Sequence, residues 1–468
     1  MKTVIEPFRA KVIESIKFTT EEERETALKL AGYNLFHLKA EDVIIDLLTD
    51  SCTSAMSSEQ WSRLMVGDES YAGCSSYFRF KDTVSKVLGF EHVLPVHQGR
   101  AAERILFGAL VKPGQHVLSN THFDTTRANI ESNGAQAIDF PDSGNREFCG
   151  NIDLRAVKRF IDEHGRSSIP LSMITLTNNS AGGQPASLEN ILAYAALLKS
   201  HDIPLFIDAA RFAENAWLIK RRERPELSVL DIVRQIFEVS DGCMMSAKKD
   251  GLSNMGGFIA CREADLCDSL KQNLILTEGF PTYGGLSGRD LECIARGINE
   301  ALEDEYLLYR EKSTLYLAQR LNDAGVPLIN PPGLHAVYID AAKFLPHLEP
   351  RELPGQALVC ALYLEAGIRA CEIGTLMFGR RDLQSGAETT HSAELVRLAL
   401  PRRVYSQSHY DYVIEAVCNV FDRRSFLKGL RIVQQPECLR HFSARMEPIE
   451  NSFTHQSGVS GGVGNYEC

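Results

Sequence analysis

The chain has 468 residues, of which 44% are hydrophobic and 24% are charged. These proportions are those of ordinary soluble proteins and exclude a fibrous or largely disordered chain. The length predicts two or three domains, or one large domain with a smaller companion. The 61 acidic residues outnumber the 50 basic ones and give a net charge of −11. A general nucleic-acid binder needs a basic surface to displace counterions from phosphates, so we expect no nucleic-acid partner.

The first residues and the cysteines bear on the compartment. The chain begins MKTVIEP, where Glu6 and Pro7 interrupt any apolar run, so no secretory signal is predicted. No stretch approaches the roughly 18 consecutive apolar residues of a membrane-spanning helix. The 12 cysteines are irregularly spaced and none forms a CxxC pair, which is typical of a reducing cytosol. We therefore expect a cytoplasmic protein with no membrane partner.

The N-terminal part predicts helices around one short strand. Thr20, followed by three glutamates, is a capping-box start for a helix, and residues 43–48 form a compact apolar run. From residue 59 to residue 88 the pattern is helical, interrupted by a loop at 67–73.

Short apolar runs then alternate with helical stretches. The runs lie at 92–96, 116–118, 170–176, 204–207, 242–245 and 257–261, and the clearest helices at 154–163, 188–200, 229–239 and 291–302. Strands that are buried on both faces have this continuous apolar character. The alternation therefore predicts an α/β fold with a mainly parallel sheet covered by helices.

The pattern changes after about residue 303. A long helix is expected at 306–324, and short strands then alternate with helices between 335 and 421, which is typical of a smaller α+β domain. The end of the chain is polar and rich in glycine, so we expect it to be disordered. The predicted division is an N-terminal arm with part of the small domain (1–48), a large cofactor-binding domain (49–305), a small C-terminal domain (306–447) and a tail (448–468).

Polar residues follow three of the predicted strands, at the sheet edge where α/β folds bind ligands. Gly99 follows the run at 92–96 and begins a helix, whose free N–H groups could cradle a phosphate. Asp208 directly follows the run at 204–207, and Lys248 and Lys249 come shortly after the run at 242–245. Taken singly, Asp208 could cap the next helix and the two lysines could be solvated surface residues.

Their order favours a cofactor site. A phosphate turn, a strand-end aspartate and a strand-end lysine about forty residues later form the layout of a pyridoxal-phosphate enzyme. In such enzymes the lysine amine bonds to the cofactor aldehyde, and the aspartate keeps the pyridine nitrogen protonated.

Longer motifs point to a family. The segments DLLTDS (46–51), GDESYAG (67–73), HQGR (97–100), SAGGQP (180–185), MSAKKD (245–250) and EGFPTYGGL (278–286) resemble those of the β-eliminating lyases. The resemblance extends from about residue 6 to residue 445. It implies a fold-type-I pyridoxal-phosphate enzyme, similar to the aspartate aminotransferases in fold. It also implies a homotetramer that requires a monovalent cation such as potassium.

The resemblance implies a role for each residue of the cofactor site. Lys249 would carry the cofactor, and Asp208 would pair with its ring nitrogen. The other implied contacts are Phe123 at the ring face, Asn179 and Arg211 at the ring oxygen, and Gln98, Gly99, Arg100, Ser246 and Lys248 at the phosphate.

It also implies the substrate and cation contacts. Arg397 would grip the carboxylate of an amino-acid substrate, and Tyr71 would assist proton transfer to the leaving group. Thr49, Ser51 and Asn179 would hold the same end of the substrate as Arg397. Glu69 and the backbone carbonyls of Cys52 and Asn254 would bind the cation. Cys52 stands where the family has glycine, so its φ angle must suit a non-glycine residue.

Three positions facing the leaving group distinguish two branches of the family. Asp124, Ile373 and His441 match the members that release indole from tryptophan, whereas those that release phenol from tyrosine carry Thr, Arg and Phe there. Indole has only an N–H to donate, which Asp124 could accept directly or through His441. Ile373 supplies no donor for a phenol oxygen. We therefore expect β-elimination of L-tryptophan to indole, pyruvate and ammonium.

Three alternatives stay open from the sequence. The first is the tyrosine reaction of the same family, and the second is an aminotransferase on the same fold, which needs a 2-oxo acid acceptor. The third is a non-enzymatic scaffold, which the presence of Lys249, Asp208, Arg397 and Tyr71 disfavours.

Overall fold

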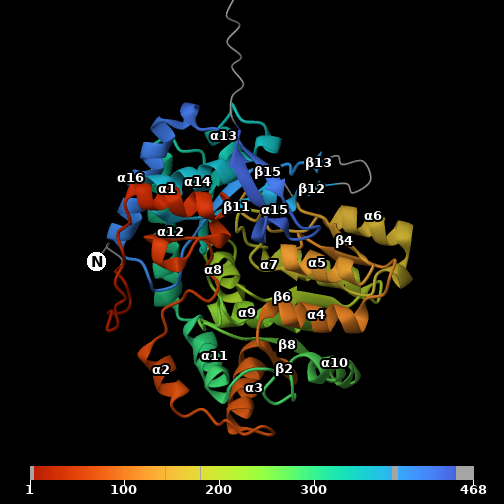
Figure 1. The fold of residues 1–468 in the computed structure, drawn as a ribbon. Helices are drawn as coiled ribbons and strands as arrows, with labels where there is room; N and C mark the ends of the chain where they lie inside the picture. The colour runs from red at the N-terminus through yellow and green to blue at the C-terminus, as the bar shows by residue number, and fades with distance from the viewer. Residues whose placement is uncertain (1–4, 143, 180, 382–387, 450–468) are drawn as a thin grey trace, which may run out of the picture.

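The computed structural model describes residues 5–142, 144–179, 181–381 and 388–449 (Figure 1). Its central sheet has seven strands in the order β2-β8-β7-β6-β5-β3-β4. They are β2 (His92–Val96), β3 (His116–Ser119), β4 (Gln136–Asp139), β5 (Ser172–Thr175), β6 (Leu205–Asp208), β7 (Gly242–Ser246) and β8 (Gly257–Cys261). Strands β3 to β7 pair in parallel, and β8 runs antiparallel to both of its neighbours. The predicted mainly parallel sheet is confirmed.

Strand β4 is the one that the apolar runs did not single out. It lies at the edge of the sheet, and only Ala137 of its four residues is buried. A half-exposed edge strand needs no continuous apolar run, so the signal that identified the other strands is missing from it.

Successive residues of each inner strand point to opposite faces of the sheet. Met173, Phe206 and Met244 pack on one face, against α4 (Gly99–Leu110), α5 (Asp124–Ser132) and α10 (Ala264–Thr277). The residue after each of them packs on the other face. The helices of that face are α3 (Ser75–Leu88), α6 (Leu154–His164), α7 (Leu188–Lys199), α8 (Phe212–Arg222), α9 (Val229–Glu238) and α11 (Gly288–Glu300).

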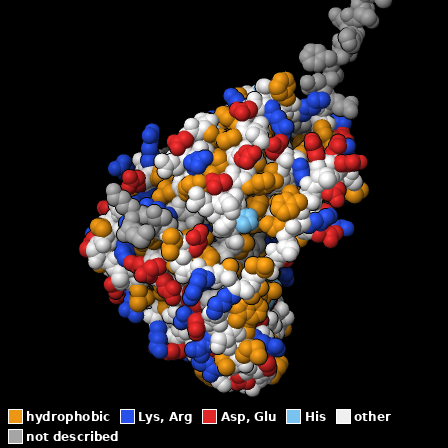
Figure 2. All heavy atoms as spheres, turned by 90° about the vertical axis from the view of Figure 1, so that its left-hand side faces the viewer, with side chains coloured by type: hydrophobic (Ala, Val, Ile, Leu, Met, Phe, Trp, Pro, Cys, Tyr) orange, Lys and Arg blue, Asp and Glu red, His pale blue; other side chains and the backbone are white. Residues whose placement is uncertain are grey.

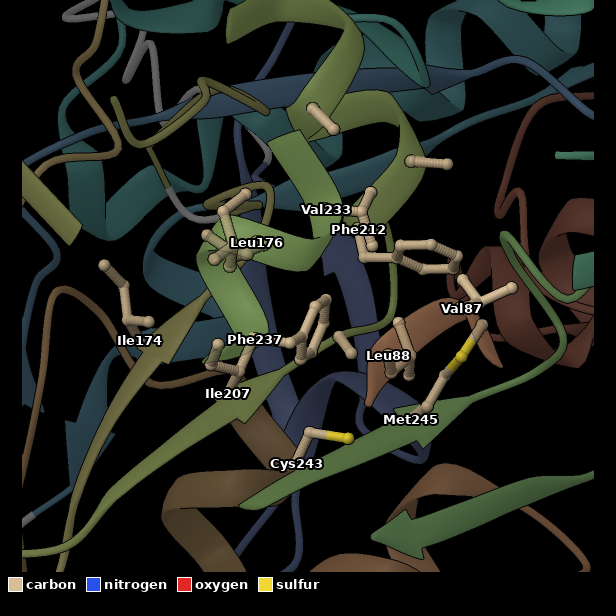
Figure 3. Close-up of a cluster of buried hydrophobic side chains, with 14 of the residues drawn as sticks. Val87, Leu88, Ile174, Leu176, Ile207, Phe212, Val233, Phe237, Cys243 and Met245 are labelled. Atoms are coloured by element: carbon tan, nitrogen blue, oxygen red, sulfur yellow. The ribbon is translucent and has the colours of Figure 1, made fainter. Parts of the chain in front are cut away.

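Aromatic side chains pack against the second face of the sheet. In Figure 3, Phe212 of α8 and Phe237 of α9 lie over Ile207 and Cys243 of the central strands, and the two rings meet edge to face at 6.1 Å. This packing fixes the ends of β6 and β7, which carry Asp208 and the Lys249 turn.

A second group of elements surrounds a three-stranded antiparallel sheet, in the order β11-β14-β9. Its strands are β9 (Ala336–Asp340), β11 (Cys371–Ile373) and β14 (Leu395–Ala399), with helices α12 (Asp304–Asp323), α14 (Pro354–Ala366) and α16 (Gln407–Asp422). The N-terminal helix α1 (Glu21–Leu30) packs beside α14, although the two lie at opposite ends of the chain (Figure 1). Thr20 caps α1 with the predicted capping box.

The N-terminal segment joins this second group through its apolar residues and through β1 (Ile45–Asp46), which pairs with β10 (Ile368–Arg369). The domain boundaries proposed from the sequence stay a prediction, and the expected disorder of the tail falls almost wholly outside the described residues.

The remaining elements are α2 (Ser58–Leu64), α13 (Ala341–Phe344), α15 (Thr375–Phe378), β12 (Arg380–Arg381), β13 (Glu388–Thr389), β15 (Leu430–Gln434), β16 (Arg445–Pro448) and the 3₁₀ turns η1 (Leu35–His37), η2 (Ala40–Asp42), η3 (Arg166–Ser168), η4 (Pro350–Glu352), η5 (Arg424–Phe426) and η6 (Arg440–Phe442).

The surface mixes charges of both signs. Figure 2 shows acidic and basic side chains interspersed with apolar ones over the face that it draws. Among the described residues, no helix is both long and apolar enough to cross a membrane.

Candidate active site

A pocket lies where β6 and β7 end and α4 begins. The structure brings together most of the residues that the sequence assigned to a cofactor, and adds Glu103 and Thr125 from α4 and α5. The lining residues are Ser51, Gln98, Gly99, Arg100, Glu103, Phe123, Thr125, Asp208, Ala210, Met244, Met245, Ser246, Lys248 and Lys249.

The start of α4 forms one end of the pocket. Gly99 is its first residue, and a Cβ built there would lie 2.7 Å from the Cβ of Ser246, so the close approach of the two backbones requires glycine. The first N–H groups of a helix have no partner within it, and they favour an anion. Lys248, whose Nζ donates to Gln98 Oε1 at 3.2 Å, adds a positive charge. This end of the pocket suits a phosphate group.

Lys249 and Asp208 line the middle of the pocket. Burial, together with the nearby Arg211, lowers the pKa of Lys249 to about 8, so a substantial fraction of its amine is neutral near physiological pH. Burial raises the pKa of Asp208, and the positive charge of Lys249 opposes that shift. A lysine that is readily deprotonated is a good nucleophile toward an aldehyde.

Arg211 does not line the pocket but lies behind it. Its Nε and Nη2 donate to the two carboxylate oxygens of Asp50, at 2.9 and 2.7 Å. The predicted contact of Arg211 with the ring oxygen of a cofactor stays a prediction.

Arg397 and Asn179 meet beside the pocket. Nη1 of Arg397 donates to Asn179 Oδ1 at 3.1 Å, and Nη2 donates to the carbonyl of Leu48 at 2.9 Å. The hydroxyl of Tyr338 also donates to Asn179 Oδ1, at 2.7 Å. Nε of Arg397 is buried and has no hydrogen-bond partner among the described residues. A buried N–H without a partner is costly, and an incoming carboxylate would satisfy it.

Two predicted substrate residues lie in the loop between β1 and α2. Ser51 lines the pocket, and its N–H donates to the hydroxyl of Thr49 at 3.0 Å, so the two residues form one turn. Thr49 itself is not among the lining residues.

The three positions that are predicted to face the leaving group come from separate elements. His441, in the 3₁₀ turn η6, places Nε2 2.9 Å from Oδ2 of Asp124, the first residue of α5, although the angle is outside that of a hydrogen bond. Both side chains are buried. Ile373 is 1% exposed in an apolar cluster of the small sheet, and Phe36 packs against both this cluster and the His441 ring.

Tyr71 and Glu69 lie away from the pocket lining. The Tyr71 side chain is 69% exposed, and its ring packs against Tyr283 at 5.2 Å. Glu69 accepts from Arg289 Nε at 2.9 Å and from the N–H of Gly288 at 3.1 Å.

The expected cation site has no independent support. Cys52 adopts the left-handed φ of 61° that its glycine-like position demands, and its N–H donates to the carbonyl of Lys248 at 3.0 Å. In the part of the chain that the structure describes, no three His, Cys, Asp or Glu side chains form a metal cluster. A site made with the carbonyls of Cys52 and Asn254 stays a prediction.

The sequence patterns missed several residues around the pocket. Glu103 is a carboxylate among apolar residues on the buried side of α4, and that mismatch is a signal that could have identified it. Burial raises the pKa of Glu103 to about 7, although the hydrogen bond that Glu103 accepts from the Thr126 hydroxyl acts to lower it. Two further contacts join distant segments: Arg402 donates to Asp50, and Nε2 of His335 lies 3.1 Å from Oδ1 of Asn179. Asp50, His335 and Arg402 therefore have no comparable local signal.

Known proteins resemble this chain over nearly its full length. A family profile described as β-eliminating lyase matches residues 46–416. The chain belongs to the β-eliminating lyase family. A tryptophanase of Hyphomonas neptunium is 53% identical over 457 residues, covering 96% of this chain and all of the relative. A tyrosine phenol-lyase of Pasteurella multocida is 45% identical over 451 residues, covering 95% of this chain and 98% of the relative.

Solved structures confirm the expected fold of this β-eliminating lyase. A serine palmitoyltransferase of Sphingomonas wittichii has a TM-score of 0.59 with 13% sequence identity, covering 87% of this chain and 97% of that one. Such a likeness shows the fold alone, which is that of the fold-type-I enzymes. Family membership makes the protein an enzyme, a carbon–carbon lyase.

Proposed function

We propose that this lyase uses pyridoxal 5′-phosphate to cleave L-tryptophan into indole, pyruvate and ammonium. The observation that carries the choice of tryptophan is the buried Asp124–His441 pair. Three tryptophanase relatives, at 50–53% identity, are also more similar to this chain than the tyrosine phenol-lyase relatives, at 42–45%, whereas a probable tryptophanase of Aeropyrum pernix is 45% identical.

The residues that line the pocket suit the successive chemical groups of this cofactor. The helix start at Gly99, with Arg100, Ser246 and Lys248, suits its phosphate, and Phe123 suits the face of its ring. Asp208 suits the ring nitrogen and Lys249 the aldehyde. When bound, pyridoxal phosphate supplies an electron sink for negative charge at the substrate Cα.

The protein's own groups then hold the substrate and move its proton. The guanidinium of Arg397, with its unpartnered Nε, binds the substrate carboxylate beside Asn179 and the Thr49–Ser51 turn. The amine of Lys249, which can be neutral near physiological pH, accepts the proton from Cα.

The leaving group selects the substrate. The indolyl anion is a poor leaving group, so indole leaves after its C3 gains a proton, and positive charge then develops toward the ring nitrogen. Asp124 stabilises that charge, with His441 beside it. A tyrosine would place its hydroxyl at an apolar wall containing Ile373, where a hydroxyl without a partner is disfavoured by about 10²-fold.

Tyr71 would supply the proton to C3 of the indole ring. The position of Tyr71 in the chain also bears on the quaternary structure. Since Tyr71 is exposed and outside the pocket of its own chain, we propose that it acts in the pocket of a neighbouring copy. A homotetramer, as the family resemblance implies, would provide such a neighbour. Potassium bound at Glu69 and the carbonyls of Cys52 and Asn254, and a cytoplasmic location, complete the proposal.

The test is a direct comparison of substrates. Purified protein is incubated with pyridoxal phosphate, potassium and either L-tryptophan or L-tyrosine, and indole, phenol and pyruvate are measured. Indole and pyruvate in equal amounts from tryptophan, with kcat/KM at least about 10²-fold above that for tyrosine, are expected. Faster release of phenol would favour the tyrosine reaction instead. Product formation that requires a 2-oxo acid would favour an aminotransferase.

A further inference from the structure

A cluster of buried charged side chains lies behind the pocket. It contains three carboxylates and three guanidinium groups, each at most 6% exposed, so its formal charges balance. Its members are Asp50, Arg211, Glu214, Asp250, Arg310 and Arg402.

Arg402 is the hub of this cluster. Nη1 donates to the backbone carbonyl and to Oδ2 of Asp50, at 3.1 and 2.9 Å. Nη2 donates to Oε1 of Glu214 and to Oδ1 of Asp250, both at 3.0 Å. One guanidinium therefore holds three carboxylates from three separate segments.

Two of these partners adjoin a residue of the pocket. Asp50 precedes Ser51, and Asp250 follows Lys249 directly. The other oxygen of Asp250 accepts hydrogen bonds from the N–H groups of Ala213 and Glu214, at the start of α8. Glu214 lies three residues after Arg211. Arg402 itself follows β14, the strand that carries Arg397.

The cost of burial explains why such a cluster must stay complete. Removing one partner from a buried ionic network leaves uncompensated charge in a poorly solvated place. A lysine could keep the charge of Arg402, but its single ammonium lacks the planar fork that reaches acceptors on opposite sides.

We propose that Arg402 is a positioning residue that holds the Lys249 turn, the Ser51 turn and the Arg397 strand in one fixed arrangement, with Asp50 as its charge partner. This inference rests on the proposed function, because it assigns those three segments to the cofactor and the substrate.

The charges around Lys249 provide a specific signature. The charged groups that influence its amine are Arg211, Asp50, Asp208 and Lys248. Asp250, the next residue in the chain, accepts a hydrogen bond from Arg402, and burial raises the pKa of its carboxyl to about 7. Loss of Arg402 leaves an excess of negative charge near the Lys249 amine, whereas loss of Asp50 leaves Arg211 without its partner and an excess of positive charge. A merely structural defect would not move the titration of Lys249 in opposite directions.

The test measures the holoenzyme of R402M and D50N in two ways. Without substrate, the pH midpoint of the visible absorbance of the cofactor bound at Lys249 is expected to rise by about one unit in R402M and to fall by a similar amount in D50N. With substrate, kcat/KM is expected to fall by about 10²-fold in both variants, because three segments lose their register.

R403M is the matched control. Arg403 is the next residue, pairs with Glu300 at 2.7 Å and stacks on Tyr306, but makes no bond to the cluster. Its midpoint and kcat/KM should stay within about twofold of the wild type. A folded R402M with wild-type midpoint and kcat/KM overturns the proposal, as does a shift of the same sign in R402M and D50N.

R402K covers the case in which R402M does not fold. It keeps the charge and loses the fork, so an unchanged midpoint with kcat/KM reduced at least about tenfold supports the proposal, and wild-type kcat/KM overturns it. If the wild type fails to cleave tryptophan, the proposed function fails. The midpoints, which need no substrate, still decide the role of Arg402.

Discussion

At the scale of single residues, the Asp124–His441 pair is the part of the proposed function that a substitution tests most directly. Asp124 and His441 are buried together, far apart in the chain, and nothing in the general chemistry of a lysine-bound cofactor requires them. In the proposed function, Asp124 and His441 act only on the indole ring. A substitution in this pair should therefore change kcat/KM for substrates that release indole and not for substrates with other leaving groups.

Asp124→Asn should reduce kcat/KM for tryptophan by about 10²–10³-fold, because the carboxylate that stabilises charge at the indole nitrogen is lost. Elimination from β-chloroalanine, whose chloride needs no such help, should change little. Steady-state assays of pyruvate with both substrates measure this. An equal loss on both would show that Asp124 supports the pocket in general.

Lys249 gives a pH prediction at the same scale. Because burial and Arg211 lower the pKa of its amine to about 8, the neutral, reactive form becomes dominant as the pH rises through 8. Trapping of pyridoxal phosphate on Lys249 of the apoprotein by borohydride should reach half of its maximum near pH 8, as followed by peptide mass spectrometry. Lys343 is the control, since the bond to Asp340 raises its pKa and its trapping should need a higher pH. Trapping of the two lysines with the same pH profile would contradict the prediction.

At the scale of elements, helix α4 connects the sheet to the anion-binding end of the pocket. Its first residue, Gly99, touches the backbone of β7, whereas Gly108 lies on its exposed side with no atom closer than 3.9 Å to an added Cβ. The same substitution at the two glycines therefore tests two different physical effects.

Gly99→Ala should weaken cofactor binding by about tenfold or more, because the added methyl group forces α4 away from Ser246. Gly108→Ala should leave binding unchanged and stabilise the protein by about 0.5–1 kcal/mol through helix propensity. Cofactor titration and thermal unfolding measure the two effects. Wild-type affinity in Gly99→Ala would exclude the close contact as a determinant of the site.

At the scale of the whole molecule, Tyr71 is the one predicted catalytic residue that the chain exposes to its surroundings. Tyr71→Phe and Lys249→Ala should each be nearly inactive alone. If Tyr71 serves a neighbouring copy, mixed assemblies of the two variants should regain activity, at most about a quarter of the wild type when half of the pockets lack each residue. Unfolding and refolding the two variants together, followed by an indole assay, measures this. No recovery in a mixture shown to contain hybrids would place Tyr71 in its own pocket or outside catalysis.

The sequence predicted much of the large sheet because its signals are local. A buried parallel strand is a continuous apolar run, and the polar residue that ends it lies at the ligand-binding edge. Asp208, Gly99 and Lys249 are each adjacent to such a run, and the structure places them in one pocket. The edge strand β4 gave no run and was missed.

Contacts between distant segments could not be predicted in this way. Asp50 and Arg402 are 352 residues apart, and neither interrupts a periodic pattern that would single it out. The same holds for the approach of His441 to Asp124 before the family motifs are considered. Charge composition constrains how many such pairs form, but only packing decides which ones do.

By itself, the sequence determined the alternation of strands and helices, the residues at the strand ends and the membership of a lyase family, since each depends on short-range pattern or on long shared motifs. The tertiary structure alone decided that Arg402 binds carboxylates from three separate segments, that Nε of Arg397 has no hydrogen-bond partner among the described residues and that Tyr71 is exposed. The reason is physical. Burial and hydrogen-bond geometry are properties of segments brought together by folding, and no single segment carries them.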